Sequence, residues 1–94
     1  VDIRKSSQTY GKCFSIELDD QKAQYLYIPK GFAHGFLSLE DGSIVNYAQT
    51  SCYNKKCDCG IDQNSIDFNW HIDHPIVSGR DLTFPSIQEF KSPF

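Results

Sequence analysis

Residues 27–36 read YIPKGFAHGF, and this stretch fixes the local course of the chain. Pro29 ends the aromatic and apolar run over residues 25–28, because proline has no N–H to donate to a strand ladder. Lys30-Gly31 then favours a turn, since glycine tolerates a positive φ. A second apolar run follows over residues 32–37. We therefore expect two strands joined by a tight turn.

The segments on either side of this stretch carry the same kind of pattern. Residues 13–18 alternate between apolar and polar side chains, which is the period of a half-buried strand, and that strand should end near Asp19-Asp20. Asp41-Gly42 precedes a further β-prone run over residues 43–47 and predicts a hairpin. Residues 66–70 alternate again, whereas only a terminal turn near residues 87–90 has helical character. Four or five short strands indicate an all-β barrel or sandwich.

The composition limits the class of protein. Ninety-four residues make one small domain or part of one, and the net charge of -3 lacks the basic excess that nucleic-acid binding needs. No apolar run approaches the roughly 20 residues that span a bilayer, so we expect no membrane partner. The chain starts at Val1 with neither Met nor a signal segment, which predicts a cytoplasmic location and suggests a fragment.

Two clusters could hold a metal ion, but a plainer interpretation is favoured for both. Cys52, Cys57 and Cys59 form C-x4-C-x-C, which lacks the C-x2-C pair of common zinc sites, and we expect reduced thiols in a polar surface loop. His71 and His74 flank Ile72-Asp73 with no helix to align them, so a solvated loop is expected there.

Taken together, four segments in order resemble the dTDP-4-dehydrorhamnose 3,5-epimerase family. Residues 2–12 resemble its DxRxxSPTxG segment, and residues 27–36 resemble (W/Y)IPxGFAHGF. Tyr47 occupies the tyrosine position of a YxxT segment, with Tyr53 six residues later. Residues 78–81, SGRD, stand in place of LSxKD or LSxRD. The resemblance runs from Asp2 to about Asp81.

The resemblance implies a cupin-type β-barrel or jelly roll, normally a homodimer, that epimerises a dTDP-4-keto-6-deoxyhexose without a metal or organic cofactor. In such an enzyme Tyr47 is the general acid, and Asp81 is the carboxylate that orients and charges the base. His34 contacts the substrate, Tyr53 stacks on the thymine, and Arg80 contacts the diphosphate. No metal ligand is implied.

The base implied by the resemblance is the histidine of an R-G-x-H segment upstream of Val1. Residues 1–94 are then expected to be the C-terminal part of a single cupin-like domain, inactive alone and prone to aggregate through unpaired strand edges. Ala48 and Gln63 replace a usual Lys and Trp, and Gln8 replaces Pro. These departures leave open a related 3-epimerase or ketoisomerase on a dTDP-sugar, or a non-catalytic cupin that binds a sugar nucleotide.

Overall fold

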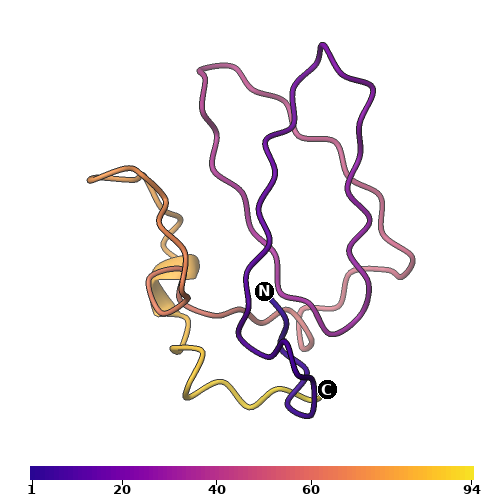
Figure 1. The fold of residues 1–94 in the computed structure, drawn as a ribbon, viewed down its shortest axis with the longest axis vertical. Coiled ribbons are helices and arrows are strands. Elements are labelled where there is room, and N and C mark those ends of the chain that lie inside the picture. The colour runs from indigo at the N-terminus through magenta and orange to yellow at the C-terminus, as the bar shows by residue number, and fades with distance from the viewer.

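The computed structural model describes residues 1–94 and contains very little regular secondary structure. Its one helix is η1, a 3-10 helix at Asp81–Thr83, and its one β-bridge is an isolated antiparallel pair between Asp2 and Phe32. Two long loops, called the arms below, are formed by residues 13–28 and residues 32–47 (Figure 1). Both start from one end of the molecule, called the base below, where the N- and C-termini lie close together (Figure 1). The orange-to-yellow C-terminal part runs along one side (Figure 1). None of the chain forms a helix long and apolar enough to cross a membrane.

The strands expected over residues 13–18, 25–28, 32–37 and 43–47 are not formed, so the predicted all-β barrel is not confirmed. Residues 34–53 take part in no backbone–backbone hydrogen bond. A ladder requires neighbouring strands joined by backbone hydrogen bonds about 4.7–4.9 Å apart, whereas the one bridge in this chain is the isolated pair Asp2–Phe32. The arms therefore have no neighbouring strand with which to pair.

The turn predicted at Gly31 is confirmed, and the chain also turns at Gly42 and after Asp19, where the first strand was expected to end. The hairpin predicted at Asp41-Gly42 is not formed, because no strands flank that turn. Asp19 Oδ1 accepts hydrogen bonds from the backbone N–H groups of Gln21 and Lys22, each at 2.9 Å. Gly31 and Gly42 have φ values of +87° and +76°, the left-handed conformation that favours glycine. Each turn depends only on residues close together in the chain, so it forms even where the flanking strands do not.

The C-terminal third also departs from its predicted pattern. Residues 66–70 are not a strand: the rings of Phe68 and Trp70 meet edge to face at 4.9 Å, and Trp70 Nε1 donates to the carbonyl of Gln63 at 3.1 Å. The hydrogen bond from Trp70 to Gln63 shows that the segment folds back on itself. The predicted terminal turn is present, with Phe90 N–H donating to the carbonyl of Ser86 at 2.9 Å.

A buried carboxylate at Asp2 organises the base of the molecule. Its side chain is 2% exposed and accepts five hydrogen bonds. The donors are Arg4 N at 2.9 Å, Arg4 Nε at 2.9 Å, Arg4 Nη2 at 2.8 Å, Ser7 Oγ at 2.6 Å and Thr9 Oγ1 at 2.6 Å. Donors that surround an ionised carboxylate in this way fix the loop over residues 2–9.

Arg4 links the Asp2 carboxylate to the YIPKGFAHGF stretch, because its side chain also contacts Phe32 and Gly31. Its guanidinium lies 4.6 Å from the centre of the Phe32 ring, a cation–π contact. A Cβ at Gly31 would lie 2.5 Å from Arg4 Cγ, so this glycine is required by the close approach as well as by its φ. Ile3 N–H donates to the Gly31 carbonyl at 2.9 Å, and Ala33 N–H donates to the carbonyl of Val1 at 2.9 Å.

The C-terminal segment is hydrogen-bonded to the N-terminal loop at the same base. Lys5 N–H donates to the Phe94 carbonyl at 3.1 Å, and Tyr10 Oη donates to the Ile87 carbonyl at 3.4 Å. Ile3 and Ile87 are the buried hydrophobic residues of the molecule. The small core therefore lies at the base, where both ends of the chain meet.

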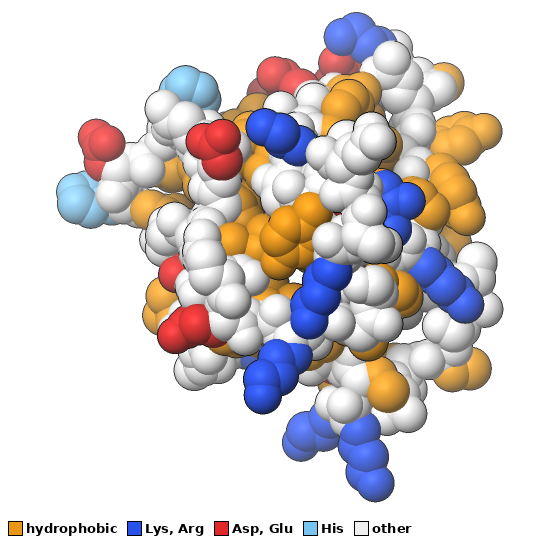
Figure 2. Space-filling view, turned by 60° about the horizontal axis from the view of Figure 1, so that its bottom comes forward, with side chains coloured by type: hydrophobic (Ala, Val, Ile, Leu, Met, Phe, Trp, Pro, Cys, Tyr) orange, Lys and Arg blue, Asp and Glu red, His pale blue; other side chains and the backbone are white.

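Most of the large apolar side chains lie outside this core. They include Tyr25, Tyr27, Phe36 and Ile44 on the arms, each more than 70% exposed. Apolar groups appear between the charged side chains over much of the face in Figure 2. Soluble monomers rarely expose apolar surface on this scale, so these residues are available to pack against other protein.

Acid should weaken the Asp2 anchor. Hydrogen bonds from the Arg4 guanidinium hold the pKa of Asp2 well below its ordinary value, despite the opposing effect of burial. A carboxyl with a depressed pKa contributes stability above its unfolded pKa, about 3.9, and this contribution is lost as the pH falls through the folded pKa. Asp2→Asn should reduce hydrogen-exchange protection of the Ile3 and Ala33 amides about tenfold at pH 7. It should also flatten the pH dependence of that protection below pH 4.

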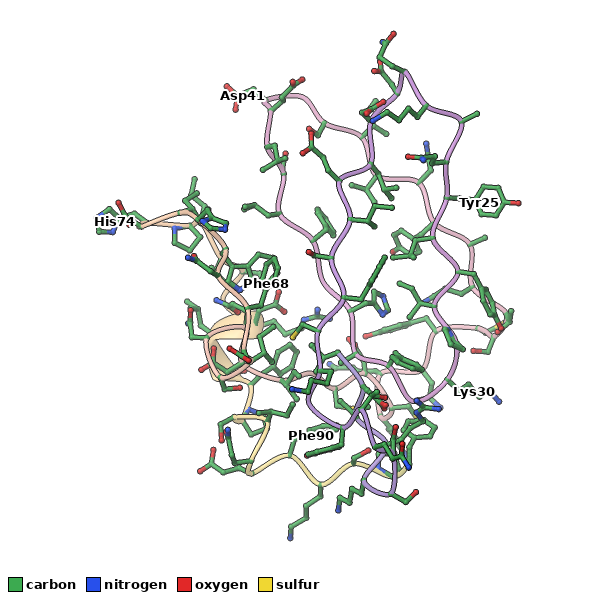
Figure 3. The ribbon with its side chains drawn as sticks, in the orientation of Figure 1. Tyr25, Lys30, Asp41, Phe68, His74 and Phe90 are labelled. Carbon is green, nitrogen blue, oxygen red and sulfur yellow. The ribbon has the colours of Figure 1, made fainter.

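Asp41→Asn provides the matched control, because Asp41 sits at the tip of an arm and its carboxylate makes no hydrogen bond (Figure 3). This variant should leave both amides unaffected. Equal protection in wild type and Asp2→Asn would contradict the role of the Asp2 anchor.

The exposed arms predict a second property of the 94-residue chain. In isolation it should bind a dye such as ANS strongly and form concentration-dependent aggregates, because exposed apolar surface associates in water. Light scattering and dye fluorescence over a concentration series check this expectation. A dye-silent monomer with a sharp cooperative melt would contradict it.

Candidate functional site

Three of the five predicted site residues meet around Asp58. Tyr53 Oη donates to Asp58 Oδ2 at 3.3 Å, and Arg80 Nη1 donates to the same oxygen at 2.8 Å. Arg80 Nε donates to Asp81 Oδ1 at 3.0 Å. The guanidinium of Arg80 thus lies between two carboxylates, and one of them also holds the phenol of Tyr53.

Helix η1 places the Arg80–Asp81 pair. Arg80 is the N-cap residue, and its carbonyl accepts hydrogen bonds from Thr83 N at 3.0 Å and Thr83 Oγ1 at 2.7 Å. The Asp81 N–H donates to Ser78 Oγ at 3.1 Å. These short-range bonds give a single helical turn from which Arg80 and Asp81 both project.

A turn at Asn54 places Asp58. Asn54 Oδ1 accepts from Lys56 N at 3.0 Å, and the Asn54 carbonyl accepts from Cys57 N at 2.9 Å. Asparagine is favoured in turns because its side chain bonds to the backbone two residues on. This turn reverses the chain after Tyr53 and allows Asp58 to reach the phenol.

Phe84 packs between helix η1 and the loop that carries Asp58. The Arg80 guanidinium lies 5.3 Å from the centre of the Phe84 ring. In the loop that carries Asp58, a Cβ added at Gly60 would collide with the same ring. Only glycine therefore permits the loop that carries Asp58 to approach Phe84 this closely.

The cluster also sets the protonation of its members. Burial and the negative charge of Asp58 raise the pKa of Tyr53 above its ordinary value of about 10. The hydrogen bond to Asp81, together with the charge of Asp58, raises the pKa of Arg80. At neutral pH Tyr53 is a neutral donor and Arg80 is a cation.

The remaining two predicted residues, His34 and Tyr47, are exposed and make no side-chain hydrogen bond to the cluster. All five predicted residues border one large open space, but 60 of the 94 residues of the chain line it. Its volume of about 3560 Å³ far exceeds the roughly 300–1,000 Å³ of ordinary ligand pockets. Figure 3 shows side chains projecting into this open interior from several segments. The structure therefore gathers Tyr53, Arg80 and Asp81 closely but not His34 and Tyr47.

A smaller pocket of about 310 Å³ lies beside Tyr53 and Asp58, within the size range of a small-ligand site. Its lining is mainly polar and comes from one loop. The lining residues are Gln49, Ser51, Cys52, Tyr53, Asn54, Cys57 and Asp58.

The two clusters considered for metal binding do not converge. Cys52, Cys57 and Cys59 are free and exposed, and no three His, Cys, Asp or Glu side chains are arranged so that they could hold a metal ion. His74 lies at the tip of a projecting segment (Figure 3), and the expected exposed loop at residues 71–74 is confirmed.

The residues missed by sequence reasoning are Asp58 and Phe84. Asp58 was visible only as a carboxylate between two cysteines, five residues after Tyr53. Its ion pair with Arg80 joins residues 22 positions apart. No local pattern reports such a contact.

Comparison with known proteins is consistent with these motifs. Residues 1–89 match the family model described as dTDP-4-dehydrorhamnose 3,5-epimerase. The chain is 40% identical over 94 residues to the protein of that name from Methanothermobacter thermautotrophicus, covering 95% of this chain and 51% of the relative. It is 46% identical over 83 residues to the one from Escherichia coli K12, covering 88% and 44%.

The chain spans about half the length of the curated relatives it matches, and it corresponds to their C-terminal part. No solved structure matches it. With a family match over residues 1–89 and motifs that follow in the same order, the chain belongs to the dTDP-4-dehydrorhamnose 3,5-epimerase family.

Proposed function

We propose that this chain supplies part of the active site of an epimerase that inverts C3 and C5 of dTDP-4-keto-6-deoxyglucose in dTDP-rhamnose-type deoxysugar biosynthesis. The observation that carries the proposal is the Tyr53–Asp58–Arg80–Asp81 cluster. It unites residues from two separate segments, Tyr53 and the neighbouring pair Arg80-Asp81, and it borders the open space that Tyr47 and His34 also line. The names of the relatives support the same reaction.

The chemistry requires a base, an acid and stabilisation of an enolate. The C4 ketone acidifies the C3 and C5 protons, so a base removes each proton and the electron pair moves onto the C4 oxygen. When the C4 carbonyl reforms from the enolate, an acid on the opposite face delivers a proton to C3 or C5. The carbon is inverted, and the acid and base return to their resting protonation by exchange with solvent.

Tyr47 is proposed as the acid. A phenol O–H can donate its proton to a carbanion-like centre, which is the role of a general acid. The Tyr47 side chain is 81% exposed in the open interior and has no hydrogen-bond partner that would hold it away from a substrate. The phenol is therefore free to donate to a bound substrate.

Asp81 is proposed to orient and charge the base. Its Oδ1 is engaged by Arg80 Nε, while its Oδ2 accepts no hydrogen bond. That second oxygen is free to accept a hydrogen bond from the N–H of an imidazole. The 94 residues contain no R-G-x-H segment, so we propose that the base histidine comes from that segment elsewhere in the protein, and that the 94 residues alone do not turn over.

The nucleotide end of the substrate is assigned to Tyr53 and Arg80. Arg80 uses Nε and Nη1 within the cluster, which leaves Nη2 for a phosphate oxygen. The Tyr53 ring, beside the 310 Å³ pocket, offers a face on which thymine can stack. His34 is proposed to contact the substrate from the open space that it lines. No metal or organic cofactor enters the reaction as proposed.

We also propose that residues 1–94 are the C-terminal part of one cupin-type domain, whose arms pair as barrel strands in the assembled protein. Support comes from the alternation over residues 13–18 and from the confirmed turn at Gly31 between the arms. A homodimer would cover some of the exposed apolar side chains. The four free cysteines favour a cytoplasmic location.

Proton exchange tests the proposed reaction. Protein made from the complete reading frame is incubated with dTDP-4-keto-6-deoxyglucose in D2O, and deuterium at C3 and C5 is followed by NMR. Deuterium at both carbons supports the double epimerase. Exchange at C3 alone replaces it with the 3-epimerase, and substrate binding without exchange replaces it with a non-catalytic binding protein.

Removing the proposed acid should act on the chemical step. Tyr47→Phe should lower kcat about 100-fold or more and leave KM within about threefold, because the phenol donates its proton only in the transition state. Steady-state kinetics on the complete protein measure both constants. Tyr25→Phe is the matched control, since Tyr25 also lies on an arm but points outward (Figure 3). Equal loss of binding and turnover in Tyr47→Phe would remove Tyr47 from the acid role.

A further inference from the structure

We infer that Asp58 is a positioning residue that holds Arg80 and Tyr53 in the geometry needed to bind the nucleoside diphosphate end of the substrate. This inference rests on the proposed function. No motif in the sequence assigned Asp58 a role, and its carboxylate is the one group that touches both proposed nucleotide contacts.

The geometry supports the inference because a single oxygen receives both donors. Asp58 Oδ2 accepts from Tyr53 Oη at 3.3 Å and from Arg80 Nη1 at 2.8 Å. The phenol and the guanidinium come from segments 27 residues apart, and no hydrogen bond joins them directly. Their relative position is therefore set through Asp58.

The Gly60–Phe84 contact shows that this placement is built into the fold. Phe84 lies under the Arg80 guanidinium and excludes any side chain at Gly60, two residues after Asp58. The loop can reach η1 only through that glycine. The approach of Asp58 to Arg80 thus follows from packing as well as from charge.

The ion pair itself adds little to stability. The Arg80 and Asp58 side chains are 60% and 27% exposed, and exposed ion pairs contribute little to folding. Their effect is on orientation instead. With Asp58 removed, Arg80 keeps Asp81 and the Phe84 ring as partners, and Tyr53 loses its hydrogen bond.

Charge and positioning predict opposite results for the same substitution. Removing a carboxylate makes the site more positive by one charge, so simple attraction predicts tighter binding of an anion. Loss of positioning predicts weaker binding, because the guanidinium and the ring must then be ordered when the ligand binds. Whether the affinity for the anion rises or falls in the variant therefore distinguishes an effect of charge from an effect of positioning.

The test is titration calorimetry with dTDP on protein from the complete reading frame. Asp58→Ala should weaken dTDP binding about tenfold, and Asp58→Glu should restore it to within about threefold of wild type. Asp73→Ala is the control, because it removes the same charge from an exposed loop residue without a side-chain partner. In turnover, Asp58→Ala should raise KM and leave kcat within about twofold. Its thermal midpoint should match wild type.

Unchanged or tighter dTDP binding in Asp58→Ala would overturn the inference, and so would a loss confined to kcat. Failure of the wild-type protein to bind dTDP would instead overturn the proposed function. NMR then decides the role of Asp58 without any ligand. In Asp58→Ala the Arg80 Nη1 hydrogens, which bond to Asp58, should exchange faster with solvent, and the pKa of Tyr53 should fall, since the Asp58 charge raises it. No change in either signal would show that Asp58 positions neither side chain.

Discussion

The base of this molecule depends on the carboxylate of Asp2. Five donor groups surround it, three of them from Arg4. The Arg4 side chain also contacts the ring of Phe32 and lies close to Gly31. A charge buried in this way is tolerable only when it is paired and fully hydrogen-bonded. The loop over residues 2–9 and the turn at Gly31 must therefore form together. The C-terminus joins the same base through Lys5 and Phe94.

A second junction, at Phe84, brings the site together. Its ring contacts the Arg80 guanidinium and excludes a side chain at Gly60, which sets the distance between η1 and the loop that carries Asp58. Between the two junctions the arms are held only by their turns. The groups proposed for nucleotide binding are thus preorganised, whereas Tyr47 and His34 lie on arms that lack neighbouring strands. The position of the proposed acid is therefore the least fixed part of the site.

The sequence predicted local features well and non-local ones poorly. The turns at Asp19, Gly31 and Gly42 follow from the conformational preferences of one or two residues, and all three are present. The strands required pairing partners along the chain, and these are not in place. Similarly, motif resemblance predicted Tyr53, Arg80 and Asp81 as site residues, but Asp58 joins them across 22 residues through a contact that no periodicity reports.

The central claim is that the Tyr53–Asp58–Arg80–Asp81 cluster receives the nucleotide end of a dTDP-sugar. Chemical-shift mapping tests it most directly: dTDP is added to isotope-labelled protein from the complete reading frame, and the perturbed backbone and side-chain signals are assigned. The account predicts that the largest saturable shifts fall on Tyr53, Asp58 and the Arg80 guanidinium, with the His71–His74 loop unmoved. Saturable shifts centred elsewhere, with these three residues unaffected, would contradict it.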